Sequence, residues 1–153
     1  ELHNLLTPER LRTVDRLLME YGLDRFRDKR PSELSGGMKQ RAALIRTLAL
    51  EPQLLLLDEP FSALDYQTRL MVSDDICRLI RAAGKTMIII THDLSEAISL
   101  ADRIIVLSGR PARVKKEMPI KLTLTDDTPL AARNAPEFQT LFNRLWEDLT
   151  DEN

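Results

Sequence analysis

The chain has 153 residues, of which 43% are hydrophobic and 30% charged, a balance that excludes a disordered segment and predicts one globular domain with a buried core. A net charge of −2 and a pI near 5.8 leave no basic footprint for nucleic acid or anionic lipid. The single cysteine, Cys77, excludes an internal disulfide and a thiolate metal cluster and indicates a reducing compartment. The longest apolar runs, residues 54–57 and 87–90, are far shorter than the roughly 20 residues that cross a bilayer, so any membrane association is expected to go through a partner.

Two helices are predicted in the first third of the chain. Thr7-Pro8 predicts an N-cap followed by proline at the first helical position, apolar residues then recur at helical spacing up to Tyr21, and Gly22 provides the stop. A charged connector over residues 23–33 follows. The second helix is expected from Gly37 to about Leu50, with Ser35 as its N-cap.

The middle of the chain predicts strand, helix and strand. LLLLDEP (54–60) and TMIIITHD (86–93) are apolar without alternation, which is typical of parallel strands buried on both faces. Between them, Asp65 is expected to cap a long helix that runs to about Ala83, with Gly84 at its C-terminus.

The remaining third predicts shorter elements. Asp93 and Glu96 form a capping-box pair for a helix through Leu100. Two strands joined by a turn are expected within residues 103–116. A proline-punctuated stretch without a predicted element leads to a final helix from Pro136, whose apolar stripe is Phe138, Leu141, Phe142, Leu145 and Trp146. The alternation of strands and helices predicts an α/β fold.

The triplet Ser35, Gly36 and Gly37 stands at the expected start of a helix, where glycine costs roughly 1 kcal/mol relative to alanine. Unpaired N–H groups and the helix dipole make such a mouth an anion site, and missing side chains let the anion approach the backbone. Phosphate is the predicted ligand. The alternative is that Ser35 is only an N-cap and that the glycines pack against a neighbouring element.

Polar residues also follow the two apolar strands. Asp58 can hold Mg²⁺, usually through water, and Glu59 can act as general base toward an attacking water. His92, after the next strand, can hydrogen-bond a phosphate oxygen. The alternatives are a solvated acidic pair and a structural histidine.

Four strings occur in order: LSGGMKQR (34–41), LLLLDEP (54–60), SALD (62–65) and TH (91–92). In this order and spacing they resemble the ATP-binding-cassette ATPases, over residues 34 to about 116. The resemblance implies a P-loop NTPase-like α/β fold, with a mostly parallel sheet and flanking helices, preceded by the end of a helical subdomain.

The resemblance also implies a division of the chain. Residues 1–33 would be the end of the helical subdomain and a connector. Residues 34–118 would be the part of the ATPase core with the signature, Walker B, D-loop and switch histidine. Residues 119–153 would be a C-terminal extension with an amphipathic helix.

The roles of single residues follow from the same resemblance. Ser35, Gly36 and Gly37 belong to the signature, which contacts the γ-phosphate of ATP held by a second subunit in a head-to-tail dimer. The resemblance also implies that Asp65 of the D-loop is a nucleotide-binding residue. Asp58 is the Walker B aspartate for Mg²⁺, and the catalytic residues are Glu59 and His92. The implied partners are a second ATPase subunit, membrane-spanning permease subunits and a separate substrate-binding protein, with no nucleic acid; the implied place is cytoplasmic, peripheral on the membrane.

One family part is not found in the sequence. Gly84-Lys85-Thr86 lacks the earlier glycine of a P-loop and precedes a strand instead of following one, so it is interpreted as a helix C-cap and strand start. The adenine-stacking aromatic and the Q-loop glutamine cannot be assigned either. We therefore expect the nucleotide cradle on an upstream segment, and weak ATP binding or none by residues 1–153 alone.

The function expected from the resemblance is an ATP-hydrolysing importer subunit, most like the nitrate, sulfonate and taurine group. The SALD form of the D-loop, Gly109-Arg110-Pro111 and the C-terminal helix favour that group. The alternatives are a DNA-maintenance ATPase, which places long coiled coils before the signature, and a non-catalytic partner module. The final apolar stripe is expected to be core or a cover for a sheet edge, with a dimer or regulatory contact as the alternative.

Overall fold

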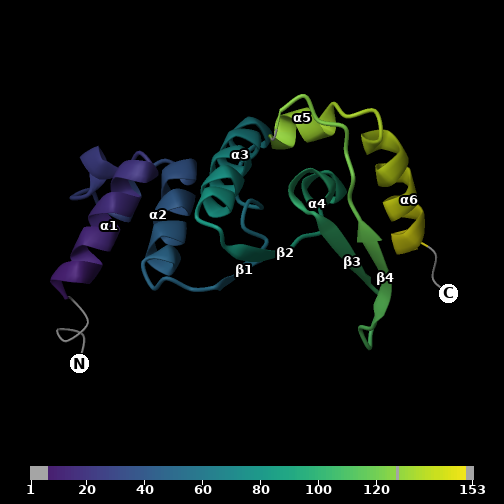
Figure 1. Ribbon diagram of the computed structural model, residues 1–153, viewed down its shortest axis with the longest axis horizontal. Coiled ribbons are helices and arrows are strands. Elements are labelled where there is room, and N and C mark those ends of the chain that lie inside the picture. Colours follow the sequence, from purple (N-terminus) through teal and green to yellow (C-terminus); the bar gives the residue numbers. More distant parts are fainter. Residues whose placement is uncertain (1–6, 127, 151–153) are drawn as a thin grey trace. The chain divides into compact units, whose positions relative to one another are not determined.

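The computed structural model describes residues 7–126 and 128–150, and the chain divides between Ile88 and Ile89 into two compact units (Figure 1). The elements before the division are α1 (Pro8–Glu20), the 3-10 turns η2 (Asp24–Phe26) and η3 (Pro31–Glu33), α2 (Gly36–Leu48), β1 (Leu54–Asp58), α3 (Tyr66–Ala82) and the start of β2 (Thr86–Ile90). Those after it are the end of β2, α4 (Leu94–Leu100), β3 (Arg103–Leu107), β4 (Val114–Pro119), α5 (Pro129–Arg133) and α6 (Phe138–Thr150). The predicted division of the chain at residues 33 and 118 follows motifs and stays a prediction.

Helix α1 forms where its capping residues predict it. The hydroxyl of Thr7 accepts a hydrogen bond from the N–H of Arg10 at 3.3 Å, and Pro8 occupies the first helical position. Gly22 has a φ of 66°, a left-handed conformation that glycine adopts without strain, and the chain turns there. The predicted helix and its stop are confirmed.

Helix α2 lies between α1 and α3 in the first unit (Figure 1). It buries Leu44, Ile45 and Leu48, as predicted, but it ends at Leu48, two residues before the expected end. The guanidinium of Arg41 donates to the backbone carbonyl of Tyr21 at 3.2 Å. This bond ties the middle of α2 to the C-terminus of α1.

Helix α3 is the crossover between the two strands of the first sheet. A carboxylate oxygen of Asp65 accepts from the N–H of Thr68 at 3.0 Å, and apolar residues at helical spacing are buried along the helix. The helix ends at Ala82, Gly84 takes a φ of 62°, and β2 begins at Thr86. The interpretation of Gly84-Lys85-Thr86 as a C-cap and strand start is confirmed.

Strands β1 and β2 are neighbours in a parallel sheet, which the crossover through α3 requires. The expectation that both strands are buried on both faces is wrong. On one face of the sheet, Leu55 is buried and 1% exposed. The large side chains on the opposite face are 47–68% exposed: Leu54, Leu56, Ile88 and Ile90. Side chains alternate across a strand, and no described part of the chain covers this second face.

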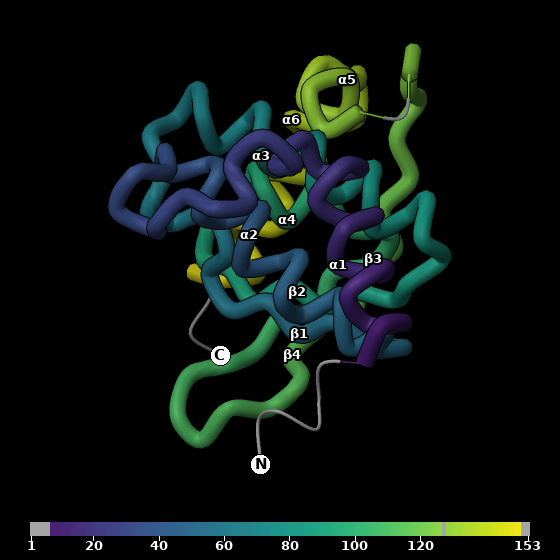
Figure 2. The backbone as a smooth tube through the Cα atoms, turned by 90° about the vertical axis from the view of Figure 1, so that its left-hand side faces the viewer, coloured from purple at the N-terminus to yellow at the C-terminus, as the bar shows by residue number. Residues whose placement is uncertain are grey.

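The second unit is built on the antiparallel hairpin of β3 and β4, as predicted. Arg103 pairs with Pro119 and Ile105 with Glu117, and the register shifts after Val106. Figure 2 follows the chain around the long loop that joins the two strands. The core cluster of this unit consists of Ile98, Val106, Met118 and Leu145.

Helix α6 covers the cluster with the predicted stripe, apart from one member. Phe138, Leu141 and Phe142 pack against the cluster and Leu145 lies in it, but Trp146 is 56% exposed. The ammonium of Lys116 on β4 also contacts the carboxylate of Asp148 at 2.5 Å, with both side chains largely covered. The stripe is therefore mostly core, as expected, and the inclusion of Trp146 was wrong because the helix turns this side chain outward.

Helix α5 was not predicted. It has five residues, too few for a hydrophobic period to show in the sequence. The hydroxyl of Thr128 caps it by accepting from the N–H of Ala131 at 3.1 Å, and Pro129 occupies its first position. These two capping residues were the local signal for it.

The neighbouring residues Leu145 and Trp146 should lose different amounts of stability on truncation. We expect Leu145→Ala to lower the free energy of unfolding by about 2–5 kcal/mol, because it empties a buried site. Urea denaturation followed by circular dichroism measures the change. Trp146→Ala is the control, with an expected loss below about 1 kcal/mol at an exposed site. Equal losses in the two variants would contradict the assigned core.

Candidate functional site

The mouth of α2 presents two exposed residues and one buried residue. Ser35 caps the helix, with its hydroxyl accepting from the N–H of Met38 at 3.3 Å. Ser35 and Gly36 are exposed, and Gly37 is buried. The N–H groups of a first helical turn have no partner within the helix and carry the positive end of its dipole. The exposed part of the triplet can therefore receive an anion.

The glycines of this triplet also face other parts of the first unit, Gly37 facing α3 and Gly36 the turn before α3. A Cβ at Gly37 would lie 2.8 Å from Cγ2 of Val72 and 3.6 Å from Cγ2 of Thr68. A Cβ at Gly36 would lie 3.0 Å from Cδ2 of Leu64. The packing alternative weighed for these glycines is thus realised within the chain, most strongly at Gly37, and it coexists with an open Ser35 and Gly36.

Asp58 and Glu59 follow β1 in different surroundings. Asp58 is the last residue of the strand and is exposed, and Glu59 is half-buried. The backbone of Glu59 has a φ of 46°, a left-handed conformation that costs a non-glycine residue about 1–3 kcal/mol. The amide and hydroxyl of Ser62 donate to the carbonyl of Glu59 at 3.3 and 2.9 Å, which holds the turn. Glu51 has a similar φ of 51°, so backbone strain does not by itself distinguish Glu59.

Asp65 lies at the start of α3, directly after Leu64, and so close to the mouth of α2. Its exposed carboxylate accepts hydrogen bonds from Thr68, and these lower the pKa of the Asp65 carboxyl from its ordinary value of 3.8. The side chain predicted to contact nucleotide therefore also serves as a helix cap. The first unit thus brings Ser35, Gly36, Leu64 and Asp65 into one neighbourhood.

His92 belongs to the second unit, whereas Asp58, Glu59 and Asp65 belong to the first. It is exposed and lies in the short connection between β2 and α4. The hydroxyl of Thr91 accepts from the N–H of Asp93 at 3.1 Å, and a carboxylate oxygen of Asp93 accepts from the N–H of Glu96 at 3.0 Å, capping α4. The N-cap half of the predicted capping-box pair is confirmed, and the two bonds fix the backbone on both sides of His92.

A single exposed carboxylate suits Mg²⁺, which keeps several waters and is held by one or two carboxylates together with substrate phosphates. Asp58 fits that description. Within residues 7–126 and 128–150, no three His, Cys, Asp or Glu side chains gather as a metal cage. Over the same residues, no helix combines the length and the apolar character needed to cross a bilayer.

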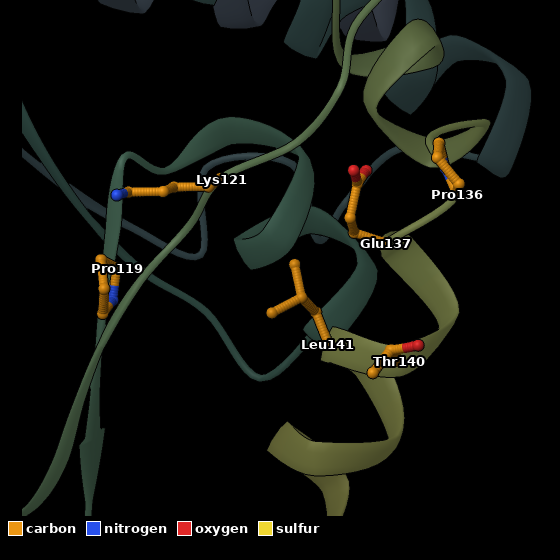
Figure 3. A pocket seen from close by; sticks show the side chains of 6 residues that line it. All are labelled: Pro119, Lys121, Pro136, Glu137, Thr140 and Leu141. Atoms are coloured by element: carbon orange, nitrogen blue, oxygen red, sulfur yellow. The ribbon is translucent and has the colours of Figure 1, made fainter.

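A shallow pocket of the second unit lies away from all of these residues in the sequence. It is lined by Pro119, Lys121, Pro136, Glu137, Thr140 and Leu141 (Figure 3). The carboxylate of Glu137 accepts from the N–H and the hydroxyl of Thr123 at 3.0 and 2.6 Å. It is thus occupied in holding the segment after β4 to the start of α6, and the pocket offers no convergent set of polar groups among the residues that line it.

Two contributions to this site were missed by sequence reasoning. The Ser62 bonds to the carbonyl of Glu59 had a local signal, a serine four residues after the end of the strand, where hydroxyls often close turns. The contacts of Leu64 and Val72 with the glycines had none, because they join segments that are distant in sequence.

Comparisons with known proteins give one family. A family model described as ABC transporter matches residues 3–62. The chain is 45% identical over 149 residues to an ABC transporter ATP-binding protein of Bacillus subtilis, YtlC, covering 97% of this chain and 57% of that protein. It is 41% identical over 142 residues to the taurine import ATP-binding protein TauB of Roseobacter denitrificans, covering 89% of this chain and 53% of that protein. The chain thus spans a little over half the length of these relatives.

A solved structure agrees with them. CbiO1 of Clostridium perfringens, described as part of the ABC transporter complex cbiONQ, matches with a TM-score of 0.66 and 29% identity. The match covers 77% of this chain and 47% of that one. The predicted α/β fold is confirmed by this likeness.

The lowered pKa of Asp65 predicts a pH dependence of stability. Because the folded-state pKa lies below the unfolded value, this carboxylate stabilises the fold fully above about pH 3.8, and the contribution is lost as pH falls through the folded pKa. Asp65→Asn keeps a capping oxygen but cannot titrate. We expect the stability difference between the parent protein and Asp65→Asn, measured by urea denaturation, to shift in favour of the variant on going from about pH 6 to about pH 2.5.

Asp28→Asn is the control, since it changes an exposed aspartate of the connector that caps no helix. The change with pH for Asp65→Asn is compared with the change measured for this variant. A constant difference for Asp65→Asn across this range would show that the cap does not depend on the charge.

Proposed function

The chain belongs to the ATP-binding-cassette family of transporter ATPases, and on this premise we propose that it carries the signature and the hydrolytic residues of a subunit that hydrolyses ATP to drive an importer. The observation that carries the proposal is the open mouth of α2, where Ser35 and Gly36 are exposed beside the start of α3. The acidic pair Asp58 and Glu59 at the end of β1 also supports the proposal.

The mouth of α2 serves a nucleotide presented by a second subunit. The terminal phosphoryl group of bound ATP carries negative charge. Hydrogen-bond donors and Mg²⁺ around it lower the free energy of that charge. The hydroxyl of Ser35 and the amides of Gly36 and Gly37 donate toward that charge. Asp65 lies close to the same mouth, directly after Leu64, and this position supports its role as the nucleotide-binding residue of the D-loop.

Asp58 and Glu59 act on the nucleotide bound by their own subunit. We place the P-loop of that subunit on a segment outside this chain. The exposed carboxylate of Asp58 holds Mg²⁺ through water. The carboxylate of Glu59 accepts a proton from the attacking water, and the Ser62 bonds to its backbone carbonyl hold the turn that carries Glu59. His92 hydrogen-bonds a phosphate oxygen.

The importer role is supported by the taurine relative, and the membrane partners by CbiO1, which is part of a transporter complex. We place the subunit on the cytoplasmic side of permease subunits, with a separate substrate-binding protein delivering the cargo. The narrower group is that of nitrate, sulfonate and taurine importers. Relatives named for transport favour this role over DNA maintenance.

The proposal predicts the behaviour of Glu59→Gln in the full-length subunit. Removing the base should lower kcat for ATP hydrolysis about 10²–10⁴-fold, because a positioned general base is worth that much. ATP binding should persist, and ATP should trap the closed dimer. Phosphate release and size-exclusion chromatography with ATP and Mg²⁺ measure the two effects.

Glu51→Gln is the matched control, because Glu51 is also a glutamate with a left-handed backbone but lies in the loop before β1. It should hydrolyse ATP at the parent rate. Normal hydrolysis by Glu59→Gln would remove Glu59 from the mechanism. Hydrolysis stimulated by DNA and indifferent to permease subunits would remove the importer.

A further inference from the structure

Gly37 lies where α2 packs closely against α3. An added Cβ would meet Cγ2 of Val72 at 2.8 Å, a separation that real Cβ atoms do not adopt. Among the described residues outside α2 itself, only Val72 and Thr68 lie within 4 Å of that position. Any side chain at residue 37 therefore displaces one of the two helices or the side chain of Val72.

Val72 is poorly able to give way. It is 4% exposed in the interior of α3, and a β-branched side chain in a helix has one strongly preferred rotamer. A rotation about χ1 would exchange one buried methyl group for the other. The contact between residue 37 and Val72 therefore sets the minimum distance between α2 and α3.

The two glycines consequently have different tasks. Gly36 is exposed at the mouth, where its backbone can meet a ligand, while the Cα of Gly37 faces into the chain against Val72. Resting on the function proposed above, we infer that Val72 is a positioning residue for the signature. Its packing against Gly37 sets where the amides of the first turn of α2 stand, and Gly37 lacks a side chain because of α3 and not because of the nucleotide.

Position matters at such a mouth because fixed donors stabilise a developing charge only at the correct distance. A misplacement of about 1 Å can lower a rate about 10²-fold. The hydroxyl of Ser35 already uses one lone pair on Met38, so the cap holds the first turn from within. The packing of Gly37 against Val72 holds the same turn from outside α2 and links it to α3. Helix α3 begins at Tyr66, directly after its cap Asp65.

The alternative is that a methyl group at residue 37 would strike the partner subunit's nucleotide directly. The two explanations differ in what repairs the defect. A clash with Val72 is relieved by shortening Val72, since the methyl group added at residue 37 then fills the space left by Cγ2. A clash with the nucleotide is not.

The test is a mutant cycle in the full-length subunit, with Gly37→Ala, Val72→Ala and the double variant. We expect Gly37→Ala to lower kcat for ATP hydrolysis at least about tenfold, as an overpacked contact that moves the donors should. Val72→Ala should lower kcat about three- to tenfold, because the first turn of α2 loses the contact that positions it. The double variant should return to within about threefold of the parent protein, because the methyl group at residue 37 restores the contact. In the Glu59→Gln background, the ATP concentration for half-maximal dimerisation should rise about tenfold with Gly37→Ala and return with the double variant.

The matched control is Ile76→Ala, which shortens another buried residue of α3 that does not lie within 4 Å of a Cβ at residue 37. Combined with Gly37→Ala it should restore neither hydrolysis nor dimerisation. Recovery with Ile76→Ala would show that any cavity in α3 relieves the defect and would overturn the specific role of Val72.

Two further outcomes overturn the inference. One is a Gly37→Ala variant with parent activity. The other is an inactive Gly37→Ala variant with the parent unfolding temperature that Val72→Ala does not rescue, because the added methyl group then meets the ligand.

A parent protein that hydrolyses no ATP in the presence of permease subunits would instead contradict the proposed function. The unfolding temperatures of the same four proteins still decide the contact in that case. An unfolding temperature that Gly37→Ala lowers and the double variant restores supports the contact with Val72. Additive changes in the unfolding temperature overturn it.

Discussion

The contact between Gly37 and Val72 is the constraint on which the first unit depends. It determines how close α2 can come to α3, and the Arg41 bond to the carbonyl of Tyr21 links α2 to the C-terminus of α1. Three helices are thereby arranged through one close approach and one charged hydrogen bond. Because the approach occurs at the first turn of α2, the same packing that stabilises the unit also orients the helix mouth that we assign to phosphate.

The residues assigned to hydrolysis are placed by a short, hydrogen-bonded connection. Asp58 ends β1 and Asp65 caps α3, so the whole turn between strand and helix spans only residues 59–64. The Ser62 bonds hold the carbonyl of Glu59, and Leu64 reaches the backbone of Gly36. The acidic pair and the signature are therefore connected through the D-loop within one chain, although in the proposed dimer they act on different nucleotides.

The second unit has its own source of stability. Helix α6 places Leu145 in the cluster on the β3–β4 hairpin, and the contact of Lys116 with Asp148 joins strand to helix at the edge of that core. The exposed apolar face of β1 and β2 has no comparable cover among the described residues. The sheet of the first unit thus relies on one buried face, centred on Leu55.

The sequence by itself determined every α-helix except α5 and most of the candidate residues, because both depend on residues that lie near one another in the chain. Each N-cap accepts a hydrogen bond from the residue three positions later, so neighbouring letters suffice to recognise it: Thr7, Ser35, Asp65 and Asp93. The four family strings are likewise read in sequence order. Only the tertiary structure decided that Gly37 meets Val72, that one face of β1 is exposed and that Trp146 turns away from the core. These outcomes depend on which distant segment packs against a residue, and periodicity and composition do not contain that information.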